Sequence, residues 1–247
     1  MKLLIIRHAE SSNNRIALNL DYAEYMRKRS ADPTITELGM RQAELLGQHL
    51  AGEPPEDAPP GGKGRYGITH LYCSPMLRTL QTAKPAVAAL GLKPKIWIDI
   101  HEHGGMFVGN PRTGEDFISH PGLTREEIMR EYPDYELHEG ISDEGWWKMG
   151  YEELEDCYAR AIRVARQLRQ RAHEEQESHT KSTVAIVSHG TFIDCLIKAL
   201  FNQIPENHFF YFHNNTAITG IDFAPNDTLF LRFLNRTAHL PPDMISE

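Results

Sequence analysis

Apolar residues form two short, continuous runs in this chain, at residues 3–6 and 184–187. A continuous run, as opposed to an alternating one, is typical of a strand that is buried on both faces of a sheet. Each run is followed by a polar residue, a histidine and sequence compatible with a helix. Buried strands that alternate with helices indicate a parallel sheet covered on both faces. We therefore expect an α/β fold, a three-layer α/β/α sandwich with a mostly parallel central sheet.

Helical periodicity is clearest over residues 152–171. Apolar side chains recur there at the spacing of one buried helix face, at Leu154, Tyr158, Ala161, Ile162, Ala165 and Leu168. A second helix is expected after residues 34–37, where Thr34 and Thr36 are alternative N-caps. A third is expected over residues 74–90, because the glycine that follows is typical of a helix end.

The remaining strands and loops follow from shorter patterns. Further strands are predicted at residues 68–73, 95–100, 209–212, 216–223 and 228–234, the last three joined by short turns. Residues 52–64 are rich in proline and glycine, and residues 171–181 are polar, so we expect two surface segments. Residues 110–150, with a small helix near residues 124–131, are expected as an insertion beside the sheet that overhangs the site. No linker is visible, so a single domain over residues 1–247 is predicted.

Composition and charge restrict the function. The chain has 247 residues, of which 40% are hydrophobic, and this is enough to form a core without disulfides. Its 26 basic and 34 acidic residues give a net charge of −8, which argues against nucleic-acid or anionic-membrane partners. No apolar stretch approaches the ~20 residues of a membrane span, and the spacing of the three cysteines fits neither a disulfide framework nor a zinc site. We expect a cytoplasmic protein; no pattern indicates an oligomeric state.

Two histidines come directly after the two buried strands. The carboxyl ends of parallel strands lie at one edge of a sheet, where ligands bind, so we expect His8 and His189 to face one another. The helix that starts at Gly190 would offer backbone N–H groups to an anion. Arg7 and Arg78 would supply planar donors for phosphate oxygens. Each feature alone is compatible with a structural or solvated side chain, but together they favour a phosphate site.

Four segments, in a fixed order, resemble the signature of the histidine phosphatase superfamily, the phosphoglycerate mutase-like family. They are Arg7-His8-Ala9-Glu10-Ser11 with Asn14, Leu38-Gly39 with Gln42-Ala43 after Thr36, Ser74-Pro75 with Arg78 and Gln81-Thr82-Ala83, and Val187-Ser188-His189-Gly190. The segment of Glu102, which is followed by Gly104-Gly105 and later by Gly109, is similar to the segment that holds the family's catalytic acid. The resemblance reaches from residue 3 to about residue 197, and residues 15–31 and 110–150 lie outside it.

The resemblance implies a phosphomonoesterase that acts on a small phosphorylated metabolite and needs no metal and no other cofactor. His8 would attack phosphorus and form a phosphohistidine, which water then hydrolyses. Glu102 would protonate the leaving oxygen and later deprotonate the water. The phosphoryl oxygens would be held by Arg7, Arg78 and His189, with Asn14 and the Gly190 amide assisting. A nucleophilic imidazole must be neutral, and the nearby arginines would lower its pKa from the reference value of ~6.5.

Other functions stay open at this point. Ala9 stands where the family more often has glycine. The run His103-Gly104-Gly105-Met106 replaces the Arg-His-Tyr-Gly stretch of the cofactor-dependent mutases, and this favours a phosphatase over mutase-type phosphoryl transfer. A module that binds phosphate without turnover is a second alternative. A metallohydrolase that grips zinc through His101-Glu102-His103 is a third.

Two features outside the resemblance also have two interpretations. Trp146 and Trp147 either line the substrate pocket or anchor the insertion, and anchoring is the commoner role of such residues. Arg27, Lys28 and Arg29 either form a solvated helix face, which is the commoner case, or reach a second phosphate of a bisphosphorylated substrate.

Overall fold

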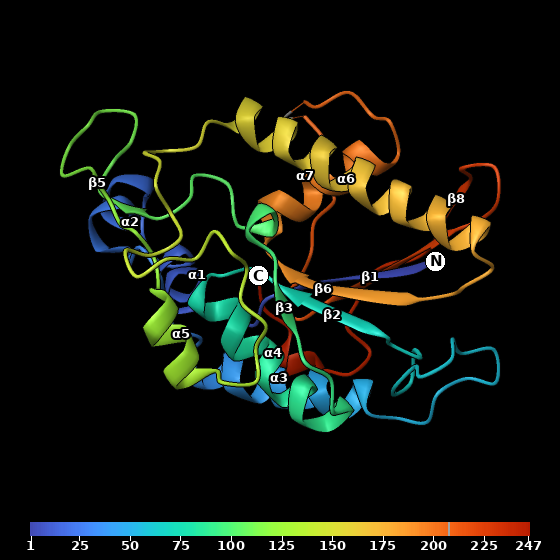
Figure 1. The fold of residues 1–247 in the computed structure, drawn as a ribbon. Helices are drawn as coiled ribbons and strands as arrows, with labels where there is room; N and C mark the ends of the chain where they lie inside the picture. Colours follow the sequence, from blue (N-terminus) through green and yellow to red (C-terminus); the bar gives the residue numbers. More distant parts are fainter. Residues whose placement is uncertain (207) are drawn as a thin grey trace.

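A six-stranded sheet crosses the centre of the structure, a computed structural model that describes residues 1–206 and 208–247 (Figure 1). In spatial order its strands are β3 (Lys95–Ile96), β2 (His70–Cys73), β6 (Thr183–Ser188), β1 (Lys2–Arg7), β7 (Ile218–Phe223) and β8 (Leu229–Arg236). The first four are parallel, whereas β7 is antiparallel to both of its neighbours. The prediction of a mostly parallel central sheet is therefore confirmed.

Helices cover both faces of this sheet (Figure 1). On one face lie α3 (Glu37–Leu50) and α4 (Leu77–Leu90), and on the other lie α6 (Leu154–Glu177) and α7 (Gly190–Leu200). Side chains of β1 alternate between the two faces: Leu4 and Ile6 belong to the core with α3 and α4, and Leu3 and Ile5 to the core with α6 and α7. A strand between two cores must be apolar at every position, and this confirms the three-layer sandwich.

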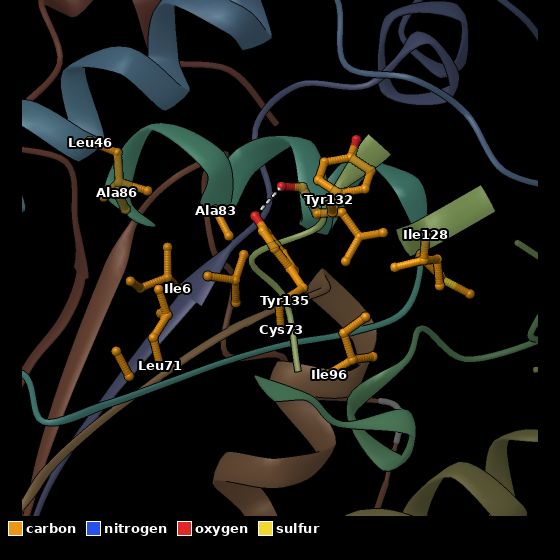
Figure 2. Packing of buried hydrophobic residues seen from close by; sticks show 14 of the residues in the cluster. Ile6, Leu46, Leu71, Cys73, Ala83, Ala86, Ile96, Ile128, Tyr132 and Tyr135 are labelled. Carbon is orange, nitrogen blue, oxygen red and sulfur yellow. Dashed lines mark hydrogen bonds between the residues drawn. The ribbon is translucent and has the colours of Figure 1, made fainter. Parts of the chain in front are cut away.

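Residues from the predicted insertion complete the first of these cores (Figure 2). Here α5 (Arg125–Glu131) and the segment after it place Ile128, Tyr132 and Tyr135 among residues of β2 and α4. The Tyr135 hydroxyl donates a hydrogen bond of 2.9 Å to the carbonyl oxygen of Leu80, so its polar atom is satisfied inside the core. Trp146 and Trp147 are buried in the same cluster, as the anchoring interpretation predicts.

The helix boundaries follow the capping residues. Thr36 is the N-cap of α3, since its hydroxyl accepts a 3.0 Å hydrogen bond from Gly39 N, and so of the two alternatives Thr36 is the cap. The small helix α5 begins after Thr124, which forms a capping box with Glu127. The third predicted helix corresponds to α4, which ends before Gly91.

Two predicted strands are wrong in part or in full. Residues 209–212 form no strand: the sheet edge beyond β1 is filled by β7 and β8, and Tyr211 N instead donates to the Asp194 carboxylate. The strand predicted at residues 95–100 ends at Ile96 and turns into the 3₁₀ helix η1 (Ile98–Ile100). This turn directs the chain away from the sheet edge and toward α6.

The long helix α6 also differs from its predicted range. It continues to Glu177, through part of the segment that was expected as a surface connection, because Ala172 and Glu175 keep the buried periodicity. Ile162, which was expected on the apolar face, is exposed. The segment 52–64 does form a loop, with one bridge between Lys63 and Ile68.

Short elements surround the edge where β1 ends. They are α1 (Ser12–Ala17), α2 (Tyr22–Lys28) and the two-stranded pair β4 (Phe107–Val108) and β5 (Ile118–Ser119); η2 (Pro242–Met244) lies near the C-terminus. In the part of the chain that the structure describes, no helix is long and apolar enough to cross a membrane. The single domain over residues 1–247 stays a prediction.

Candidate active site

The carboxyl ends of β1, β6 and β2 meet at one edge of the sheet. His8 N donates a 2.9 Å hydrogen bond to the Ser188 carbonyl, and Ser74 N donates one of 3.1 Å to the Val187 carbonyl. The residues that follow these strands are therefore neighbours. The ring centroids of His8 and His189 lie 5.2 Å apart, as the sequence predicts for two histidines at this edge.

Hydrogen bonds define the tautomer of His8. Its Nδ1 lies 2.7 Å from the Ala9 carbonyl oxygen, and since a carbonyl can only accept, we assign the proton to Nδ1. The lone pair is then on Nε2, which accepts a 3.1 Å hydrogen bond from Arg78 Nε. Burial, followed by the charges of Arg78 and Arg7, holds the pKa of His8 well below its usual value. The ring is neutral with its electron pair on Nε2, the form that a nucleophile requires.

His189 is fully buried and has one unused nitrogen. Its Nε2 lies 2.8 Å from the Ser74 hydroxyl, whereas Nδ1 is buried without a hydrogen-bond partner among the described residues. Burial and the charge of Arg78 hold its pKa well below the usual value too. The sequence motif contains Ser74, but nothing in the pattern indicated that it would orient this ring.

Two arginines flank the histidines. Arg7 donates through Nη1 to the His213 carbonyl, and its Nε is buried without a partner in the described chain. Gly190 lies beside it: a Cβ atom at this position would come within 3.4 Å of Arg7 Nε. Arg78, the second residue of α4, contacts His8 through Nε and has its Nη1 3.9 Å from Asp32 Oδ1.

Glu102 is held by three backbone donors. Its carboxylate accepts hydrogen bonds from His103 N at 2.9 Å, Phe192 N at 3.0 Å and Thr191 N at 3.3 Å. The last two belong to the first turn of α7. The side chain of Glu102 therefore occupies the N-terminus of this helix through Thr191 N and Phe192 N, while the Gly190 amide, which the sequence assigned to a phosphate, is not among its donors.

A cavity of about 260 Å³ brings most of the candidate residues together. Those that line it are Arg7, His8, Asn14, Arg78 and Glu102. His189 and Gly190 are not in its wall. No residue between 110 and 150 lines it, whereas Phe107 and Tyr151, which flank this segment in sequence, do. The overhang of the insertion stays a prediction. A larger cavity of about 590 Å³ beside β3 contains none of the candidates, so size does not locate the site.

The two histidines around Glu102 have different partners. His101 is buried, with Nδ1 2.7 Å from the Ile98 carbonyl and Nε2 3.6 Å from the Glu152 carboxylate. His103 instead lies 3.4 Å from the Tyr151 hydroxyl. Within the described residues, no group of three or more His, Cys, Asp or Glu side chains is arranged to hold a metal ion. Residues 101–103 therefore do not form the zinc site that the metallohydrolase alternative needs.

Asp32 is a site neighbour that the sequence did not indicate. Its Oδ1 accepts a 3.0 Å hydrogen bond from Leu77 N, at the start of α4, and its Oδ2 is buried without a partner in the described structure. Burial raises the pKa of Asp32 to about 7, against the opposing charge of Arg78. An aspartate before a proline is typical of a turn, and only tertiary packing places it beside Arg78.

A buried ion pair between Arg160 of α6 and Glu152, which precedes this helix, holds the segment before Glu102. Arg160 donates to both carboxylate oxygens of Glu152, at 2.8 and 2.6 Å. Its Nη1 also donates to the carbonyls of Asp99 and His101, at 2.8 and 2.9 Å. Apolar periodicity alone did not reveal this contact, because Arg160 occupies a buried position of the helix.

The chain is similar to known proteins over nearly its whole length. The family model described as the histidine phosphatase superfamily (branch 1) matches residues 3–236. The chain is 26% identical to phosphoserine phosphatase 1 of Hydrogenobacter thermophilus, over 97% of this chain and 94% of the relative. It is 23% identical to a probable phosphoglycerate mutase, GpmB, of Yersinia enterocolitica, over 100% of this chain and 98% of the relative.

Solved structures show the same fold. A phosphoserine phosphatase mutant from Entamoeba histolytica, in complex with phosphoserine, superposes with a TM-score of 0.55 at 18% identity, over 97% of this chain and 99% of that one. A putative alpha-ribazole-5'-P phosphatase from Escherichia coli superposes with a TM-score of 0.59 at 19% identity, over 96% and 97%.

Proposed function

The chain belongs to the histidine phosphatase superfamily, and from this premise we propose that it hydrolyses small phosphate monoesters through a phosphohistidine at His8. The observation that carries the proposal is the state of His8. Its ring is neutral, its electron pair is on Nε2, and it lines a cavity together with Arg7 and Arg78. A nucleophile of this kind splits one difficult displacement into two easier ones.

In the first step, His8 Nε2 attacks phosphorus and the bond between phosphorus and the ester oxygen breaks. A proton from Glu102 goes to the leaving oxygen. The hydrogen bond from His8 Nδ1 to the Ala9 carbonyl then supports the positive charge of the phosphorylated ring. As the N–P bond forms, Arg78 Nε moves its hydrogen bond from His8 to a phosphoryl oxygen.

In the second step, water attacks phosphorus, gives a proton to Glu102 and displaces His8, which returns to its neutral form. Arg7 lines the cavity and its Nε has no partner in the described structure, so it is available to a phosphoryl oxygen. His189 lies outside the cavity wall, but its ring centroid is 5.2 Å from that of His8, and we assign its unpartnered Nδ1 to the phosphoryl group once phosphorus is bonded to His8. We assign Asn14 to the same group because it lines the cavity. These donors stabilise the charge that develops on the phosphoryl group.

Hydrolysis is favoured over mutase-type transfer by the path of the chain after Glu102. Gly104 and Gly105 have φ values of +84° and +73°, and a Cβ atom would lie 2.8 Å from Phe107 and 2.1 Å from Trp147, respectively. The Arg-His-Tyr-Gly stretch of the mutases puts side chains at both positions, so it cannot follow this path.

The substrate is proposed to be a small metabolite, as the names of the phosphoserine and alpha-ribazole-5'-P phosphatases state for these relatives. The cavity of about 260 Å³ has room for a compact molecule. A cytoplasmic location and chemistry without a metal stay predictions.

The test is hydrolysis of p-nitrophenyl phosphate and of an alkyl phosphate, with and without EDTA. We expect His8→Ala to lower kcat by at least about 10³-fold, as removal of a nucleophile does. Glu102→Gln should affect the alkyl ester much more, because nitrophenolate leaves without a proton. Loss of activity with EDTA and its recovery with zinc would establish the metallohydrolase. Phosphate binding without turnover of any ester would establish the non-catalytic alternative.

A further inference from the structure

A third arginine lines the same cavity as Arg7 and Arg78. Arg29 directly follows α2, and its side chain reaches the cavity wall, whereas Arg27 and Lys28 are exposed. The alternative that all three basic residues face the substrate is therefore wrong for Arg27 and Lys28. Only Arg29 has the position for such a contact.

The guanidinium of Arg29 is held in place by aromatic rings. Its Cζ lies 3.7 Å from the ring centroid of Phe107 and 5.9 Å from that of Tyr25. Phe107 is itself fixed by edge-to-face packing on Tyr151, with ring centroids 5.1 Å apart. Stacking on a ring leaves the edge of a guanidinium, with its N–H donors, directed away from the ring.

Among the described residues, this arginine has no counter-ion. Two other arginines show the alternative: the buried Arg160 pairs with Glu152, and the partly buried Arg171 pairs with Glu175. Arg29 forms no ion pair with any residue that the structure describes, and its Nε is buried without a hydrogen-bond partner. Burying an unpaired charge costs free energy, and the missing anion can come from a ligand in the cavity.

We propose that Arg29 binds a carboxylate on the alcohol portion of the substrate, so that the substrate class is the phosphate monoesters of small hydroxy acids. This inference rests on the proposed function, in which Arg7 and Arg78 hold the phosphoryl group. With the phosphoryl group held by Arg7 and Arg78, a carboxylate brings one further negative charge to Arg29, the third arginine of the cavity. A planar guanidinium also matches a carboxylate through two parallel hydrogen bonds.

The experiment uses substrate pairs that differ in the carboxylate alone: 3-phosphoglycerate with glycerol 3-phosphate, and phosphoserine with phosphoethanolamine. The readout is the ratio of kcat/KM within each pair. For the wild type we expect a ratio of about 10 to 100, the value of one charged hydrogen-bonded contact. Arg29→Gln should bring the ratio close to one, and the control Arg27→Gln on the exposed side of α2 should leave it unchanged.

Each contrary result has a separate meaning. An unchanged ratio in Arg29→Gln overturns the carboxylate assignment and leaves the proposed function intact, as long as hydrolysis still depends on His8. The same holds if the wild type hydrolyses p-nitrophenyl phosphate but neither member of a pair. An Arg29-dependent preference for fructose 1,6-bisphosphate over fructose 6-phosphate assigns the residue to a second phosphate and overturns the carboxylate. Absence of any His8-dependent hydrolysis overturns the proposed function itself.

Discussion

At the scale of single residues, burial lowers the pKa of His8 more than the neighbouring charges do. The sequence led us to expect that Arg7 and Arg78 would lower its pKa, and both do, but removal of the ring from water is the first cause. His8 lies between a carbonyl that holds its Nδ1 proton and an arginine that donates to Nε2. The surroundings thus fix the protonation state and the reactive nitrogen before a substrate enters.

The pH dependence of His8 follows from this. Its imidazole should stay neutral to well below pH 6.5, so kcat/KM should fall on the acid side at a pH well below 6.5. NMR titration of His8 measures the same pKa without turnover. Arg78→Gln should raise it, though not above 6.5, because burial persists. A wild-type His8 that titrates at 6.5 or higher would contradict the assignment.

The pKa of Asp32 is shifted in the opposite direction from that of His8: burial raises it. Its pKa is about 7 in the folded protein against a model value of 3.8, so between these values the folded state binds the extra proton. The free energy of unfolding should therefore fall as pH rises through this window, by about 2–3 kcal/mol between pH 5 and pH 8. Asp32→Asn should remove that slope in urea unfolding, and Asp134→Asn, at an exposed position, should keep it. Equal slopes in wild type and Asp32→Asn would exclude a titrating Asp32.

The sequence predicted those site residues whose positions depend only on their neighbours in the chain. Arg7 and His8 are adjacent in the chain and follow a legible strand, so their position at the sheet edge follows from the pattern alone. The sequence did not indicate Asp32, and it did not separate Arg29 from Arg27 and Lys28, because the positions of Asp32 and Arg29 depend on α4 and on Phe107, which are distant in sequence.

At the scale of elements, helices fix the position of the acid Glu102. The first turn of α7 donates to its carboxylate, and α6 holds the preceding carbonyls through Arg160. Periodicity predicts that both helices exist. It does not show which anion meets the start of α7 or that α6 buries an arginine, since both facts depend on how the elements pack.

Replacing Arg160 tests this bracing role. Arg160→Met removes the arginine partner of the buried Glu152 carboxylate and leaves it only the 3.6 Å contact with His101, so we expect a loss of about 3–5 kcal/mol in the free energy of unfolding. We also expect a lower kcat on alkyl phosphates, because the segment before Glu102 loses two anchors. Arg163→Met, at an exposed position of the same helix, is the control. If both variants are equally stable, the ion pair does not have this role; the double variant Arg160→Met/Glu152→Leu should recover part of the stability.

The start of α3 provides a second test at this scale. Thr36→Ala removes the N-cap hydroxyl, which also contacts the Glu10 carboxylate at 2.6 Å, and should cost about 1–2 kcal/mol in urea unfolding. Thr34→Ala should have little effect, because its side chain caps no helix. The reverse order of the two effects would show that Thr34 is the cap in solution.

At the scale of the whole molecule, the continuous apolar strands predicted the architecture correctly. Residues 3–6 and 184–187 form the adjacent strands β1 and β6 at the centre of the sheet, where both faces are buried. The errors are at the periphery. Residues 95–100 lie at the edge of the sheet, next to one strand only, and residues 209–212 lie outside the sheet. In such places a run of apolar residues does not predict that a strand forms.

The most direct measurement of the central claim is rapid-quench mass spectrometry after mixing with p-nitrophenyl phosphate in the presence of EDTA. We predict an adduct of about 80 Da, one phosphoryl group, on the peptide that contains His8, formed and lost at rates compatible with turnover. His8→Ala should show neither the adduct nor comparable turnover. Turnover that persists in His8→Ala, or a wild type that turns over without a phosphorylated His8 peptide, would contradict the account.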